Sequence, residues 1–173
     1  GGEKLEKKHI NVATQFAEEV KIYNEYGPTE ATIGCTVKEV VPGLPVTIGS
    51  PIANTSIHIL NADDQQQPPG LEGEIAISGA GLSVGYWNNT EATEQAFITN
   101  AAGERLYKTG DLGRWLENGE LAYLGRIDEQ LKVNGHRIEP MEITRVMESH
   151  SAVKSAYIIP RMELGKALGL VCY

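Results

Sequence analysis

Cysteine is scarce in this sequence. Cys35 and Cys172 are the only two, they lie far apart, and neither stands at the spacing of a metal site. The four histidines also show no pairing suited to zinc. These absences argue against a disulfide-stabilised secreted domain, and we expect a reducing, cytoplasmic compartment.

Long apolar runs and basic runs are also missing. No apolar stretch approaches the roughly 18 residues of a membrane-spanning helix. Residues 1–10 lack the apolar centre of a signal peptide. The net charge is −8, from 15 basic and 23 acidic residues, without a long basic block. We therefore expect neither a membrane nor a nucleic acid as partner.

Aromatic residues make up only 6%, whereas glycine occurs 19 times, often in tight local clusters. This pattern predicts many turns between short strands. The 173 residues, 41% of them apolar, suffice for one domain, or for one compact unit and the beginning of another.

Apolar periodicity predicts the secondary structure. Residues 3–20 have helical spacing. Alternation around His58 and Ala76 predicts two strands that each bury one face. A short helix capped by Thr90 is expected next. Residues 111–126 predict a hairpin with a two-residue Asn118-Gly119 turn.

The last part of the chain predicts a smaller unit. A short strand–turn–strand precedes a helix that starts at Pro140, and two apolar strands follow. We place the boundary so that 1–127 forms a strand-rich unit and 128–173 an incomplete α+β unit. The last strand has no closing turn, so we expect a piece of a longer protein.

The motif "NEYGPTE" brings unusual chemistry into one turn. Tyr26 offers a flat ring for stacking, and Gly27 permits close approach of a ligand to the backbone. Thr29 can hydrogen-bond a phosphate, and Glu30 supplies oxygen ligands of the kind that Mg²⁺ prefers. The same residues also fit a plain Gly-Pro turn with an exposed glutamate, so both interpretations stay open here.

Two further motifs have similar alternatives. In "YKTGDLGRW", Asp111 could accept hydrogen bonds from a diol such as ribose, or it could simply belong to a turn. In "GRIDEQLKVNGHRIEP", Arg126 could meet an anion and Asp128 could act as a hinge, or the segment could be a solvated hairpin.

Taken in order, four motifs resemble the adenylation domains of nonribosomal peptide synthetases. They are "NEYGPTE", "GEIAISGAGLSVGYW", "YKTGDL" and "GRIDEQLKVNGHRIEP". The resemblance covers most of the chain and places it in the adenylate-forming superfamily. Acyl-CoA synthetases, aryl-acid ligases and D-alanine–carrier ligases are alternatives within that superfamily, and a non-catalytic module that binds nucleotide or carrier protein is an alternative of another class.

The resemblance implies a role for each matching residue. The nucleotide would be ATP or AMP, with Tyr26 on adenine, Thr29 at the α-phosphate and Glu30 at Mg²⁺. The nucleotide site would also include Gly27, Asp111, Tyr123 and Arg126. The amino-acid pocket would be lined by Glu25, Ile33 and Gly34. The hinge would be Asp128, and the loop of the second half-reaction would contain Gly135.

The resemblance also implies a fold and a reaction. We expect a mixed α/β protein: the end of a large core with a distorted β-barrel, then the start of a small α+β subdomain. An amino acid would be adenylated and passed to the phosphopantetheine thiol of a peptidyl carrier protein. The family's phosphate loop and its C-terminal lysine have no counterpart in these residues, so we expect the chain alone to be inactive.

Overall fold

The computed structural model describes residues 5, 10, 20–128, 130–133, 136–163 and 166–173. The helix expected over 3–20 lies almost wholly outside these residues. Gly135 also lies outside them. The chain divides into two compact units, with the boundary between Ile127 and Asp128. That boundary coincides with the expected one, and what each unit represents stays a prediction.

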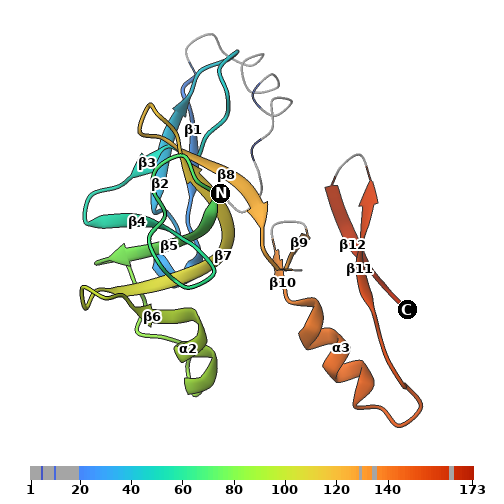
Figure 1. The fold of residues 1–173 in the computed structure, drawn as a ribbon. Coiled ribbons are helices and arrows are strands. Elements are labelled where there is room, and N and C mark those ends of the chain that lie inside the picture. The colour runs from blue at the N-terminus through green and yellow to red at the C-terminus, as the bar shows by residue number, and fades with distance from the viewer. Residues whose placement is uncertain (1–4, 6–9, 11–19, 129, 134–135, 164–165) are drawn as a thin grey trace. The chain divides into compact units, whose positions relative to one another are not determined.

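The main sheet of the first unit has five antiparallel strands (Figure 1). They are β4 (Thr55–Leu60), β5 (Gly73–Gly79), β6 (Phe97–Thr99), β7 (Arg105–Trp115) and β8 (Leu121–Arg126). β5 lies between β4 and β7, and the long β7 also pairs with β6 and β8. β7 is therefore the strand that joins most of the sheet.

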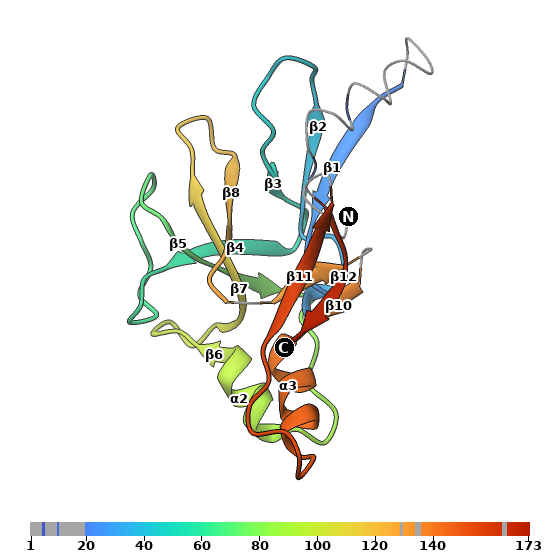
Figure 2. The same ribbon diagram turned by 90° about the vertical axis from the view of Figure 1, so that its right-hand side faces the viewer.

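A second antiparallel sheet contains β1 (Ile22–Tyr26), β2 (Thr36–Val40) and β3 (Ser50–Pro51). The backbone of Leu121 in β8 bonds Ile48 and Gly49, which directly precede β3, at 2.9 and 2.8 Å. The two sheets thereby form one curled half-barrel, in which β1 and β2 rise away from β4 and β5 (Figure 2).

The concave side of this half-barrel contains the main apolar core. The predicted alternation is confirmed, because Ile57 and Ile59 of β4 and Ile75 and Ile77 of β5 are buried in one cluster. His58 points to the other face and contacts Ser78. Burial of these four side chains stabilises the sheet by roughly 1.5–3 kcal/mol each.

Two local predictions were wrong. The hairpin between β7 and β8 has a three-residue loop, since Leu116 N–H donates to Glu120 O at 2.8 Å and only Gly119 takes a positive φ, at 77°. Helix α2 (Thr90–Ala96) is capped by Asn89, whose side chain accepts from Ala92 N–H, and not by Thr90.

The second unit contains two hairpins and a helix. β9 (Leu131–Val133) pairs with β10 (His136–Ile138), and β11 (Ile158–Glu163) pairs with β12 (Lys166–Cys172). Helix α3 (Pro140–Glu148) lies between them in the sequence. Pro140 occupies its first turn, as expected, where a missing N–H costs nothing.

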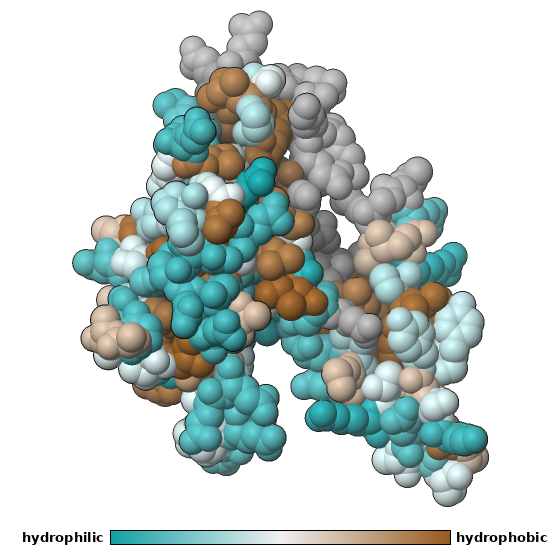
Figure 3. Space-filling view, viewed as in Figure 1, coloured by the Kyte–Doolittle hydropathy of each residue, from teal (hydrophilic) through white to brown (hydrophobic). Residues whose placement is uncertain are grey.

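Most of the regular secondary structure in the described residues is β, with two short α-helices, and every strand pair is antiparallel. The expected mixed class is therefore confirmed only in part. The face shown in Figure 3 is polar with several apolar areas. No helix in the described part of the chain is long and apolar enough to cross a membrane.

Candidate functional site

Tyr26 and Asp111 meet, although 85 positions separate them in the sequence. The Tyr26 hydroxyl donates a hydrogen bond of 2.6 Å to Asp111 Oδ2. Tyr26 ends β1 and Asp111 lies within β7, so curling of the two sheets brings them together. Burial, and then the negative charge of Asp111, raise the pKa of the Tyr26 phenol well above its usual value, so this phenol remains a donor.

The other oxygen of Asp111 faces Arg126. Arg126 Nη1 lies 3.0 Å from Asp111 Oδ1 and also 3.2 Å from the carbonyl oxygen of Thr109. Asp111 and Arg126 are directly opposite each other in the β7–β8 ladder. Their side chains are only 10% and 14% exposed, so the ion pair is largely shielded from water.

A second aromatic ring stands beside Tyr26. The ring centroid of Tyr123, from β8, is 6.1 Å from that of Tyr26, and the planes are tilted by 46°. Two adjacent aromatic rings next to a carboxylate–guanidinium pair suit a ligand with a flat ring and hydroxyl groups. The structure thus gathers four of the predicted residues: Tyr26, Asp111, Tyr123 and Arg126.

Thr29 and Glu30 form a short 3-10 turn directly after β1. Thr29 is exposed, whereas Glu30 is buried. Glu30 Oε1 accepts a 2.6 Å hydrogen bond from the Tyr86 hydroxyl. Burial, and then this hydrogen bond, raise the pKa of Tyr86. Sequence reasoning missed Tyr86, because nothing in the spacing of the two residues signals a contact across 56 positions.

Gly27 allows the loop after β1 to fold back tightly. A Cβ on Gly27 would lie 2.1 Å from Ile33 O and 2.8 Å from Cys35 N. The same fold-back lets Cys35 N–H donate to Tyr26 O at 2.8 Å. Gly27 is therefore required by close backbone approach within the loop itself.

The three residues predicted for the amino-acid pocket lie at the end of this loop. The Glu25 carboxylate covers Gly34, where a Cβ would be 2.1 Å from Glu25 Oε1. Ile33 is 70% exposed. The structure thus brings Glu25 and Gly34 together and leaves Ile33 open to solvent. Nothing in these contacts tests their role in selectivity.

Asp128 is the first residue of the second unit, and its Oδ1 accepts from Gln130 N–H at 3.1 Å. Its role as a hinge stays a prediction.

Within the described ranges, no group of three or more His, Cys, Asp or Glu could hold a metal ion. A single carboxylate such as Glu30 still fits Mg²⁺, which commonly takes one or two carboxylates together with phosphate oxygens and water. The hydrogen bond from Tyr86 would orient that carboxylate.

Comparison with known proteins points in one direction. The sequence pattern of the AMP-binding enzyme family matches residues 1–87. The chain is 46% identical over 162 residues to tyrocidine synthase 3 of Brevibacillus parabrevis, covering 92% of this chain and 2% of that protein.

Solved structures agree with this match. An adenylation domain of Vibrio cholerae, AlmE, in complex with glycyl-adenosine-5′-phosphate superposes with a TM-score of 0.87 at 32% identity, over 99% of this chain and 34% of that one. A synthetase protein containing adenylation and PCP domains gives 0.85 at 30% identity, over 99% and 36%. The chain thus spans a small part of the proteins that it matches, and it belongs to the AMP-binding enzyme family as part of an adenylation domain of the nonribosomal peptide synthetase type.

Proposed function

We propose that the protein containing this chain is an AMP-forming ligase of the cytoplasm that activates an amino acid. The carboxylate attacks the α-phosphorus of ATP, aminoacyl-AMP forms and pyrophosphate leaves. The thiol of a phosphopantetheine group on a peptidyl carrier protein then attacks the acyl carbon and AMP leaves. Support comes from the glycyl-adenosine-5′-phosphate complex of one similar structure and the adenylation and PCP domains of another.

One observation in the chain itself carries the proposal: Tyr26, Asp111 and Arg126 converge. We assign the Tyr26 ring, with Tyr123 beside it, to adenine. Asp111 and Arg126 would hold the ribose. A carboxylate has about four acceptor sites, so Asp111 can accept ribose hydroxyls while keeping its bonds to Tyr26 and Arg126.

The phosphate end would lie at the turn that follows β1. Thr29 is exposed, so its hydroxyl would be available to the α-phosphate. Glu30, oriented by Tyr86, would hold Mg²⁺. When bound, the metal would offset the charge that two reacting anions bring together. Holding the reactants in line can contribute roughly 7–11 kcal/mol to lowering the barrier.

The proposal also assigns a part of the enzyme to each of the two units. The half-barrel of the first unit would be the end of a large core with a distorted β-barrel. The second unit would be the beginning of a small subdomain that moves about Asp128 between the two half-reactions and brings the loop at Gly135 to the thiol step. Glu25, Ile33 and Gly34 would line the amino-acid pocket.

Exchange of labelled pyrophosphate into ATP tests the proposal. In the intact protein that contains these residues, we expect exchange that depends on one or a few amino acids. Exchange supported only by fatty, aryl or D-alanyl substrates would move the protein to another branch of the superfamily. Nucleotide binding without exchange for any acid would contradict the ligase and favour a binding module. The 173-residue chain alone should show no exchange.

A further inference from the structure

Strand β7 is interrupted at the place where it carries Asp111. The pairing of β5 with β7 passes from Glu74↔Leu112 to Ala76↔Lys108, so three residues of β7 lie opposite the single residue Ile75. Such a bulge re-aims side chains and leaves backbone groups without ladder partners. Asp111 is the third residue of this bulge, so its direction depends on how the bulge is held.

Thr109, the first bulge residue, uses its side chain to hold both itself and Asp111 in place. Its hydroxyl donates to Ile75 O at 2.7 Å and accepts from Asp111 N–H at 3.0 Å. The middle residue, Gly110, has a φ of 71°, which favours glycine. Its carbonyl oxygen accepts from Ile127 N–H at 2.8 Å. Its N–H points away from any ladder partner and needs an acceptor of another kind.

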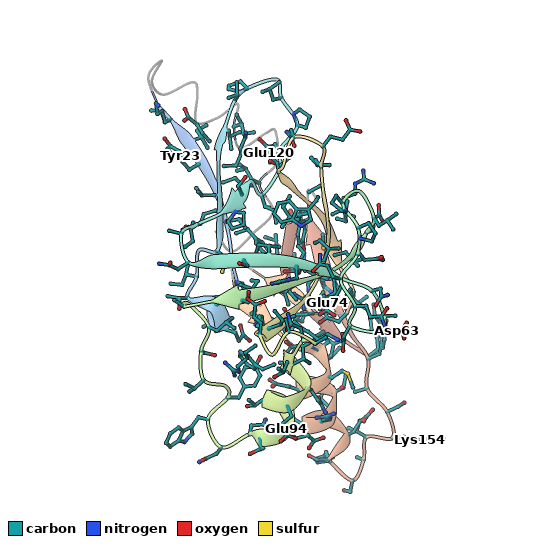
Figure 4. The ribbon with its side chains drawn as sticks, turned by 60° about the vertical axis from the view of Figure 1, so that its left-hand side comes forward. Tyr23, Asp63, Glu74, Glu94, Glu120 and Lys154 are labelled. Atoms are coloured by element: carbon teal, nitrogen blue, oxygen red, sulfur yellow. The ribbon has the colours of Figure 1, made fainter. Side chains whose placement is uncertain are left out.

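That acceptor is the side chain of Glu74. Gly110 N–H donates to Glu74 Oε1 at 2.8 Å. Glu74 Oε2 is 3.5 Å from Lys108 Nζ, and Lys108 also reaches Asp64 Oδ1 at 2.5 Å. Glu74, labelled in Figure 4, is only 16% exposed, so its bond to Gly110 is partly shielded from water.

We propose that Glu74 is a positioning residue for nucleotide binding: its carboxylate holds the Gly110 N–H and thereby the bulge that presents Asp111 to the ribose. This inference rests on the proposed function, because it assumes that Asp111 binds ribose hydroxyls. In this role Glu74 would act through Asp111 and would not contact the nucleotide itself. Removal of the Glu74 carboxylate should therefore weaken nucleotide binding only by weakening the contacts to the ribose hydroxyls.

The test compares ATP with 2′,3′-dideoxy-ATP, which lacks those hydroxyls, by titration calorimetry of the intact protein. We expect the unmodified protein to bind ATP about tenfold more tightly. Glu74→Leu should weaken the affinity for ATP by about tenfold and leave the affinity for the dideoxy nucleotide unchanged, so that the preference for ATP disappears. Glu74→Gln should retain most of the preference, because its amide oxygen can still accept from Gly110.

A neighbouring glutamate provides the matched control. Glu72 contacts Arg114 at 3.3 Å outside the bulge and is 59% exposed. Glu72→Leu should leave both affinities unchanged. A folded Glu74→Leu variant that still prefers ATP would overturn the role of Glu74 while leaving the ribose role of Asp111 intact. No preference in the unmodified protein would overturn both.

A second measurement applies even where Glu74→Leu fails to fold. Amide hydrogen exchange, followed by NMR in the unmodified protein, should show Gly110 N–H strongly protected, and this protection should persist in Glu74→Gln. Exchange of Gly110 at the rate of an exposed loop amide would overturn the inference.

Discussion

The two ends of the proposed site differ in how completely they are built. At the adenosine end, both oxygens of Asp111 already have donors, Tyr26 and Arg126, and the ion pair is largely buried. At the amino-acid end, Glu25 is exposed and Ile33 is 70% exposed. One end is therefore preorganised, whereas the other presents side chains with room to move.

This difference matches what each end would have to recognise. A nucleotide is the same in every turnover, and a preorganised grip avoids the cost of ordering side chains on binding. Among the described residues, no buried side-chain nitrogen or oxygen lacks a hydrogen-bond partner. The adenosine end should therefore be sensitive to single atoms and the amino-acid end tolerant of change, and the first three of four predictions test this contrast.

The largest effect is expected from Asp111→Ala. It leaves the guanidinium of Arg126 largely buried without its carboxylate, which costs about 3 kcal/mol in the free energy of unfolding. Urea denaturation measures this loss. The control is Glu72→Ala, which removes the exposed contact with Arg114 and should cost less than about 1 kcal/mol. Equal losses in the two variants would contradict a preorganised adenosine end.

Next in size is the contrast between two glycines. Gly27→Ala places a methyl group 2.1 Å from the backbone oxygen of Ile33, which cannot move without opening the loop. We expect a loss of about 2 kcal/mol or more. In Gly34→Ala the nearest atom is the end of the exposed Glu25 side chain, which can swing aside, so the loss should be under about 1 kcal/mol. Thermal unfolding of both variants checks the order, and the reverse order would refute it.

A smaller effect is expected from Tyr26→Phe, which keeps the ring and removes only the hydroxyl bonded to Asp111. We expect a loss of about 1 kcal/mol in unfolding free energy and weaker binding of ATP. Tyr23→Phe, on the same strand, is the matched control. Tyr23 is exposed (Figure 4), and its hydroxyl makes only a long contact, of 3.5 Å, with Glu39. Calorimetry should find ATP affinity unchanged in that control. Unchanged affinity in Tyr26→Phe as well would remove the hydroxyl from the site.

The effect that is smallest at neutral pH concerns Cys35, and it appears only in alkali. Burial, and then the charge of Glu25, raise the pKa of Cys35 from 9.0 to about 11. The folded state therefore holds the thiol proton of Cys35 more tightly than the unfolded state does. The stability that the protonated thiol contributes is complete below pH 9 and is lost as the pH rises toward 11. The slope can reach about 1.4 kcal/mol per pH unit.

Two variants isolate this contribution. Denaturation at a series of pH values should show a shallower alkaline decline in Cys35→Ala. Cys172→Ala should follow the unmodified protein, because Cys172 is exposed. Identical profiles for the unmodified protein and Cys35→Ala would show that Cys35 does not titrate with folding.

Much of the first unit could be predicted from local pattern. The alternation of Ile57, Ile59, Ile75 and Ile77 is sufficient to predict which face is buried, because strand side chains alternate strictly. The turn at Asn118-Gly119 was predicted one residue too short, since loop length depends on which backbone groups pair across the hairpin. The cap at Asn89 was missed for a similar reason: Thr90 is an equally good capping residue by type.

The sequence by itself determined which side chains were available: a tyrosine and a glutamate around one Gly-Pro turn, an aspartate after a glycine, and an arginine at the end of a strand. Only the tertiary structure decided which of them meet. The pairing of Tyr26 with Asp111, of Tyr86 with Glu30 and of Glu74 with Gly110 depends on how the sheets curl and where β7 bulges. Curl and bulge are set by the packing of whole strands, which no short motif encodes.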